Sequence, residues 1–288
     1  MRCLLLQEES SLLLCYYYKL QISRYIRSDV TFKLQNLLYD EHSCTMIIAA
    51  QQRLLTLSCG SQINVVPTPL RRDDENSPWC YTFSVSPVII DDELTSSTLP
   101  PRTNFLATQV WPSSRIASTI LEQYLDPSWK VCELGCGPGL PSLTAAMKGS
   151  EVIATDLDEC ALEMVEAAAK EQGYTVDQRF QTQQFDLTSR QNVLPDADLY
   201  IMSDVFESSN VASSAAFHVQ SILSKNNGRQ SKRRVWVFAQ SDRAQRETFL
   251  DQMRETYDET LEWSLLQKPD IDSELWLCDL DEIAVEYN

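Results

Sequence analysis

Three glycines at alternate positions are the strongest chemical signal in this sequence. Gly135, Gly137 and Gly139 follow the short apolar run Lys130–Leu134, in a 288-residue chain that contains only seven glycines. Glycines between a strand and a helix allow a tight turn and a close approach of the backbone to a ligand, and the helix N-terminus offers free N–H groups. The spacing therefore predicts a nucleotide-like ligand at this turn.

Two carboxylates accompany the glycine turn. Asp156 ends the next apolar run, "VIATD", where an acid can accept hydrogen bonds from ribose hydroxyls. Glu133 precedes the turn, where a carboxylate repels pyrophosphate and attracts an ammonium group. The dinucleotide pattern G-x-G-x-x-G would need a third glycine at position 140, which is Leu140. S-adenosylmethionine carries an ammonium and a sulfonium but no phosphate, so these residues favour it over NAD as cofactor.

Regular alternation of strands and helices surrounds these residues from position 104 onward. Such alternation is typical of an α/β fold, in which a mostly parallel sheet has helices on both faces. The last two strands are joined by the short segment Gln267–Ser273 and are predicted to form an antiparallel hairpin at the sheet edge. The predicted strands are 130–134, 151–156, 176–185, 197–204, 234–240, 261–266 and part of 274–285, and the predicted helices are 112–124, a segment ending near 148, 158–171, 211–223 and 242–257.

The chain divides into two predicted parts, an N-terminal extension (residues 1–103) and a cofactor-binding domain (residues 104–288). In the extension, Tyr81–Val85 alternates apolar and polar residues, which marks a half-buried strand that pairs with Ile63–Pro67 in a β-hairpin. Other predictions here are a strand at 28–34, a helix or a strand within 44–60, and a linker at 94–103.

The motifs together resemble a known family. "ELGCGPG" followed by "ATD" resembles the class I, seven-strand S-adenosylmethionine-dependent methyltransferases. "VWPSS" before the turn and "LYIMSDVFES" after it narrow the resemblance to the lysine-methyltransferase-like branch, methyltransferase family 16, over roughly residues 60–285. The resemblance implies a Rossmann-like seven-strand sheet and S-adenosylmethionine as cofactor.

The resemblance also implies roles for particular residues at the cofactor. Glu133, Gly135 and Gly137, with Gly139 completing the motif, would hold the methionine end, and Asp156 would bind the ribose. Asp186 would contact the adenine, although a turn residue is an open alternative. Trp111 would lie beside the cofactor, although a core tryptophan is equally open. No metal site is expected.

At the substrate side, catalytic roles are predicted for Asp204 and Glu207. Asp204 ends the fourth strand, where ligands of parallel sheets lie. Protein-lysine methylating members have Asp-x-x-Tyr here, and Glu207 stands in place of the tyrosine. The two carboxylates would position an ammonium, while Trp111 and Phe206 would supply an apolar surround that favours the neutral amine.

Composition bears on partners and compartment. A formal net charge of −17 disfavours nucleic acid and suits a protein substrate, with a basic protein among the candidates. No apolar run approaches the roughly 18 residues of a membrane-spanning helix. Nine cysteines without C-x-x-C pairs and only two histidines predict reduced thiols rather than disulfides or a metal centre. A cytoplasmic protein is expected, with the nucleus as the alternative compartment.

The leading hypothesis is an S-adenosylmethionine-dependent methyltransferase that acts on a lysine or another nitrogen of a protein. A small-molecule N- or O-methyltransferase and a non-catalytic, methyltransferase-like binding protein are the alternatives. An NAD-dependent dehydrogenase fits the glycine spacing less well. The sequence names neither the substrate nor the oligomeric state.

Overall fold

The computed structural model describes residues 53–70, 80–85, 105–174, 179–226, 232–257 and 259–280. All of these residues belong to one compact unit, Ile47–Asn288. The strand predicted at 28–34 and the linker predicted at 94–103 lie outside the described residues.

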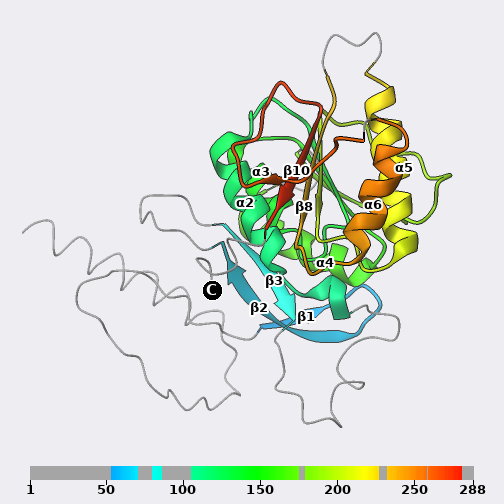
Figure 1. Ribbon diagram of the computed structural model, residues 1–288. Coiled ribbons are helices and arrows are strands. Elements are labelled where there is room, and N and C mark those ends of the chain that lie inside the picture. Colours follow the sequence, from blue (N-terminus) through cyan, green and yellow to red (C-terminus); the bar gives the residue numbers. More distant parts are fainter. Residues whose placement is uncertain are drawn as a thin grey trace, which may run out of the picture. The chain divides into compact units, whose positions relative to one another are not determined.

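A seven-strand parallel sheet forms the centre of this unit (Figure 1). The strand order is β6-β5-β4-β7-β8-β10-β9, which places β4 and β7 side by side in the middle. Every residue of β4, β5 and β7 is buried, because helices cover both faces of the sheet. The strands are β4 (Val131–Leu134), β5 (Val152–Asp156), β6 (Phe180–Gln184), β7 (Leu199–Ser203), β8 (Arg234–Ala239), β9 (Ser264–Leu265) and β10 (Leu275–Asp279).

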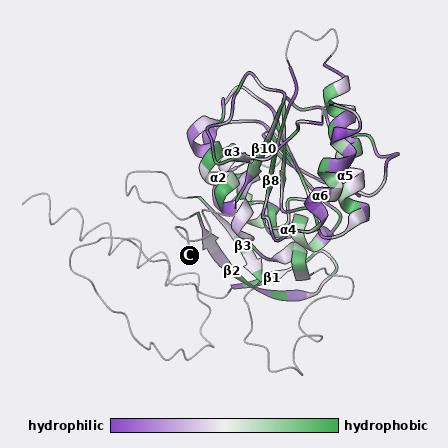
Figure 2. Cartoon of the chain, in the orientation of Figure 1, coloured by the Kyte–Doolittle hydropathy of each residue, from purple (hydrophilic) through white to green (hydrophobic). Residues whose placement is uncertain are grey.

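The helices divide between the two faces and make two cores. One core contains apolar side chains of α2 (Pro112–Tyr124), α3 (Leu140–Lys148) and α4 (Glu159–Glu171). The other contains those of α5 (Ser209–Ser224) and α6 (Gln245–Arg254). Figure 2 shows the apolar strands between them. The predicted α/β fold is confirmed, and Pro112 stands in the first turn of α2, as the sequence predicted.

A second, antiparallel sheet consists of β1 (Arg53–Thr56), β2 (Gln62–Pro69) and β3 (Tyr81–Val85). The predicted hairpin of β2 and β3 is confirmed, and the ambiguous segment 44–60 contributes the strand β1. Ile63, Val65 and Phe83 share a core with α4. The predicted division of the chain at residue 103 stays a prediction.

The predicted C-terminal hairpin is wrong, because β9 and β10 run parallel. Cys278 lies opposite Ser264 and Asp279 lies opposite Leu265. An antiparallel hairpin needs a tight turn between its strands. Here β9 has only two residues, and the connection from Leu266 to Glu274 returns the chain to the end of the sheet at which β9 began. Strand β10 therefore runs in the same direction as β9, and it also pairs in parallel with β8.

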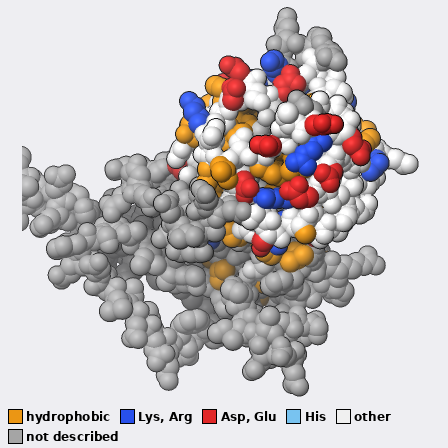
Figure 3. All heavy atoms as spheres, in the orientation of Figure 1, with side chains coloured by type: hydrophobic (Ala, Val, Ile, Leu, Met, Phe, Trp, Pro, Cys, Tyr) orange, Lys and Arg blue, Asp and Glu red, His pale blue; other side chains and the backbone are white. Residues whose placement is uncertain are grey.

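Charged side chains of both signs mix on the surface around α6. In the face shown in Figure 3, acidic and basic groups lie next to each other, and Arg254 pairs with Asp251 while Arg246 pairs with Asp279. This face is therefore not a uniformly acidic surface, despite the net charge. Among the residues that the structure describes, no helix combines the length and apolarity needed to cross a membrane.

Candidate active site

A cavity of about 300 Å³ opens at the carboxyl ends of the parallel strands, the edge where ligands of such sheets bind. Segments that follow β4, β5, β6, β7 and β8 border it, together with the start of α2. Glu133 and Gly139 do not line it. The predicted site residues that do are Trp111, Gly135, Gly137, Asp156, Asp186, Asp204 and Glu207.

The glycine turn forms one wall of this cavity with its backbone. Gly135, Gly137 and Gly139 have φ values of 71°, 50° and 71°, a backbone conformation that residues with a side chain rarely adopt. A Cβ at position 135 would lie 2.8 Å from Val205 Cγ1, and one at position 137 would lie 3.2 Å from the Ala107 carbonyl oxygen. The absence of side chains here leaves backbone at the cavity, as a closely approaching ligand requires.

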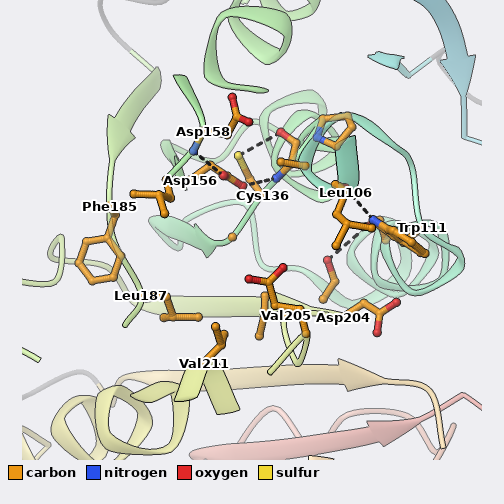
Figure 4. A pocket seen from close by; sticks show the side chains of 18 of the residues that line it. Leu106, Trp111, Cys136, Asp156, Asp158, Phe185, Leu187, Asp204, Val205 and Val211 are labelled. Carbon is orange, nitrogen blue, oxygen red and sulfur yellow. Dashed lines mark hydrogen bonds between the residues drawn. The ribbon is translucent and has the colours of Figure 1, made fainter. Parts of the chain in front are cut away.

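Asp156 is fixed at the cavity by backbone donors. Its Oδ2 accepts a hydrogen bond from the Gly137 N–H at 2.8 Å, and its Oδ1 accepts one from the Asp158 N–H at 2.9 Å. Burial raises the pKa of this carboxyl above its usual value. Figure 4 shows the arrangement beside Cys136. A carboxylate has further lone pairs, so Asp156 can also accept hydrogen bonds from hydroxyls in the cavity.

Asp186 is a turn residue and a cavity residue at once. Its Oδ1 accepts hydrogen bonds from the Thr188 N–H at 2.9 Å and the Thr188 hydroxyl at 2.7 Å, which closes the turn after β6. Phe185, Leu187 and Val211, which sequence reasoning missed, form an apolar wall nearby (Figure 4). This wall and Asp186 together suit a flat ring with polar edges.

Glu133 lies behind the glycine turn and is fully buried. Its Oε2 accepts hydrogen bonds from the Ser142 N–H at 3.0 Å and the Ser142 hydroxyl at 2.5 Å. Burial raises the pKa of Glu133 to about 8. Ser203, which does line the cavity, donates to Oε1 at 3.5 Å and lies 3.3 Å from the hydroxyl of Ser114. Glu133 is therefore connected to the cavity by the hydroxyl groups of Ser203 and Ser114.

Asp204 is bound by an arginine that sequence reasoning missed. Arg243 Nε donates to Oδ1 at 2.7 Å and Nη2 donates to Oδ2 at 2.9 Å, and these hydrogen bonds raise the pKa of Arg243. The guanidinium carbon lies 5.2 Å from the centre of the Trp111 ring, and Trp111 Nε1 donates to the Leu106 carbonyl. One signal was available: Arg243 follows β8, whose carboxyl end meets the same sheet edge.

Glu207 and Phe206 differ in their surroundings. Glu207 is exposed and lines the cavity. Phe206 is 2% exposed and packs against Phe249 and Trp263 in the core beneath α6. The prediction that Phe206 supplies an aromatic wall for the substrate is therefore wrong, and Trp111 is the aromatic residue at this end.

The parallel sheet with its glycine turn, the acid at the end of β5 and the cavity between them define a class I methyltransferase. The chain belongs to the family described as lysine methyltransferase, methyltransferase family 16, whose pattern it matches over residues 101–256. S-adenosylmethionine is the cofactor, as the sequence predicted. The side-chain-free backbone at Gly135 and Gly137 and the fixed carboxylate of Asp156 fit this molecule.

Three solved structures are among those that are similar to part of this chain. A putative S-adenosyl-L-methionine-dependent methyltransferase from Methanococcus maripaludis has 20% identity and a TM-score of 0.34, covering 50% of this chain and 64% of its own. The Thermus thermophilus 16S rRNA N2 G1207 methyltransferase, in complex with AdoMet and guanosine, has 15% identity and a TM-score of 0.36, covering 53% and 37%. TrmN from Thermus thermophilus has 21% identity and a TM-score of 0.31, covering 36% and 32%.

These values are too low to carry a substrate from those proteins to this chain. The chain spans less than two thirds of the length of each of the three structures. No curated protein sequence matches it.

Proposed function

We propose that this protein transfers a methyl group from S-adenosylmethionine to a nitrogen of a protein substrate, namely the side chain of a lysine. One observation carries the proposal: the cavity is continuous from the glycine turn to the end of β7, so that Asp156 and Asp204 border the same space. A cofactor at the turn and an acceptor at Asp204 would therefore meet. The family's description as lysine methyltransferase supports this choice of acceptor.

Each part of the cavity has a proposed task at the cofactor. S-adenosylmethionine, when bound, supplies a methyl group on a positively charged sulfur that a nitrogen lone pair can attack. The backbone of Gly135 and Gly137 would hold its methionine end, and Glu133 would support that end from behind through Ser203. Asp156 would accept the ribose hydroxyls, and Asp186 with its apolar wall would hold the adenine.

The acceptor end would guide and desolvate the incoming nitrogen. Glu207, exposed at the cavity, would attract a lysine ammonium from solvent. The amine must be neutral when it attacks, and an unperturbed lysine has a pKa of about 10.4. Trp111 and Val205 also line the cavity and would disfavour the charged form by excluding water. The proton would leave to solvent past Glu207.

Labelled methyl transfer into a cell extract tests this function. Purified protein is given methyl-labelled S-adenosylmethionine and extract, and portions are digested with protease or with nuclease. We expect macromolecular label that protease releases and nuclease does not, and methyl-lysine after acid hydrolysis. Asp156→Asn should lower the label, because the cofactor loses a ribose partner.

Other outcomes would change the function. Label confined to small molecules would replace the protein substrate by a metabolite, and label released by nuclease would replace it by nucleic acid. A protein that binds S-adenosylhomocysteine but labels nothing in extracts of several growth states would favour a binding role.

A further inference from the structure

The acceptor end of the cavity already contains a cation of its own. Arg243 makes both of its fork-like hydrogen bonds to Asp204 and lies over the Trp111 ring. A carboxylate and an indole face are the two groups that would otherwise receive the ammonium of a substrate. The side chain of Asp204 is only 1% exposed, and Arg243 donates to both of its oxygens.

This pairing makes the part of the acceptor end around Asp204 electrically neutral. An incoming ammonium would have to break a bidentate, charge-assisted pair and would approach another positive charge. The other buried or half-buried carboxylates at the cavity, Asp156, Asp158 and Asp186, accept hydrogen bonds from backbone N–H groups at the cofactor end and do not compensate there. Of the cavity-lining carboxylates, Glu207 is the exposed one.

The backbone at Asp204 indicates that the pairing is built into the fold. Its φ of 58° lies in the left-handed region, which an aspartate enters at some cost. The Asp204 N–H donates to the Phe238 carbonyl of β8, the strand that precedes Arg243. Residues kept in such a conformation by their surroundings concentrate at functional sites.

Neutrality has a chemical consequence for methyl transfer, because only an uncharged nitrogen has a lone pair to attack the methyl group. A free carboxylate beside the nitrogen would favour the unreactive ammonium and raise its pKa. A carboxylate that is already paired with a guanidinium would not.

We propose that Arg243 is the specificity-determining residue of the acceptor end: by masking Asp204, it makes this end take an uncharged nitrogen in preference to a cation. The charged lysine is attracted only as far as Glu207 and enters after losing its proton. This role rests on the proposed function, because the acceptor is taken to be a lysine nitrogen. The effect of masking on the binding of a cation can nevertheless be measured without methyl transfer.

The experiment compares two probes of equal shape, N-acetyl-lysine amide and its uncharged analogue N-acetyl-hydroxynorleucine amide. The indole N–H resonance of Trp111, assigned with Trp111→Phe, reports binding in the presence of S-adenosylhomocysteine. The measured quantity is the ratio of the affinities for the cation and the neutral probe. Arg243→Gln should raise this ratio by about tenfold, since it exposes the Asp204 carboxylate to the cation.

Two further variants distinguish the masking of the Asp204 charge from a general structural effect of removing an arginine. The double variant D204N/R243Q should return the ratio close to that of the wild type, because both charges are gone, and asparagine tolerates the left-handed backbone. Arg246→Gln is the matched control: Arg246 also pairs with an acid, Asp279, and lies over a tryptophan, Trp263, but it does not line the cavity. It should leave the ratio unchanged.

A ratio that Arg243→Gln leaves unchanged would overturn the masking role, and so would binding of neither probe to any of the proteins. Equal changes in the Arg243 and Arg246 variants would overturn it as well. Failure of the proposed function is read separately, from the absence of label in protein, and can occur together with a tenfold change in the ratio.

Discussion

The two ends of the cavity hold their carboxylates in different ways. At the cofactor end, Asp156 accepts hydrogen bonds from the N–H groups of Gly137 and Asp158, and Asp186 accepts from Thr188. At the acceptor end, Asp204 is held by the side chain of a residue 39 positions further along the chain. Backbone donors hold one end, and a side-chain fork holds the other.

Because of this difference, substitutions of side chains affect the two ends of the cavity unequally. The N–H groups of a turn are present whatever the side chains are, so the cofactor end depends on backbone conformation and on the glycines that permit it. A single substitution at Arg243 alters the charge of the acceptor end.

The largest effect is expected where the cofactor end depends on the absence of a side chain. Gly139→Ala should lower the free energy of unfolding by about 3 kcal/mol, since the left-handed conformation costs about 1–2 kcal/mol and overpacking adds about 1–3 kcal/mol. The new Cβ would collide with Val165 Cγ2 at a φ of 71°. Urea unfolding followed by fluorescence measures the change.

Gly173→Ala is the control for the backbone contribution alone. Gly173 has a φ of 80°, and a Cβ there would meet nothing within 4 Å. We expect a loss of about 1 kcal/mol. If both variants lose the same stability, packing against α4 does not constrain the glycine turn, and the cofactor end does not depend on the absence of a side chain at position 139.

The second effect concerns the carboxylate that the backbone holds. Asp156→Asn should raise the dissociation constant of S-adenosylhomocysteine roughly tenfold to a hundredfold, because a hydrogen bond to a charged group contributes about 1.5–3 kcal/mol. An amide can also accept only one of the two N–H bonds from Gly137 and Asp158. Isothermal titration calorimetry measures the constant.

Asp158→Asn provides a neighbouring control at the same cavity. Asp158 caps α4 by accepting a hydrogen bond from the Cys160 N–H, and asparagine caps helices about as well as aspartate. The affinity of the Asp158→Asn variant for S-adenosylhomocysteine should therefore differ from that of the wild type by less than about twofold. An Asp158 variant as weak as the Asp156 variant would mean that net negative charge, rather than the position of Asp156, binds the cofactor.

The third effect is a pH dependence of stability at Glu133. Its folded-state pKa of about 8 exceeds the ordinary value of 4.5, so the folded protein retains a proton that the unfolded chain releases. This contribution to stability is complete below pH 4.5 and is lost as the pH rises towards 8. Glu133→Gln mimics the protonated carboxyl and should lack this loss.

The variant should therefore gain stability relative to the wild type by roughly 3 kcal/mol between about pH 5 and pH 8. Urea unfolding at intermediate pH values measures the difference. Parallel curves for the two proteins would contradict a buried, protonated Glu133 and would indicate a carboxylate that stays charged behind the turn.

Most elements could be predicted because their signals are local. The apolar run "VIATD" forms β5, and Asp158 then caps α4 through its own side chain. Directions and partners of edge strands are different. Nothing in Leu261–Leu266 shows whether β9 pairs parallel or antiparallel, because that depends on how the following connection crosses the end of the sheet.

The candidate site divides in the same way. The glycine spacing and Asp156 were visible in the sequence because the ligand there is bound by a turn and by the end of the next strand. The sequence also placed Asp204 at the cavity, since it ends a central strand. It did not show Arg243, because the loops after β7 and β8 become neighbours only in the folded sheet.

The sequence by itself determined the class of fold, the cofactor and the conformation of the glycine turn, because periodicity, capping and glycine spacing act over a few residues. Only the tertiary structure decided that Glu133 is buried behind the turn, that Phe206 belongs to the core, and that Arg243 pairs with Asp204. The reason is physical: burial and charge pairing depend on which surfaces meet across the sheet.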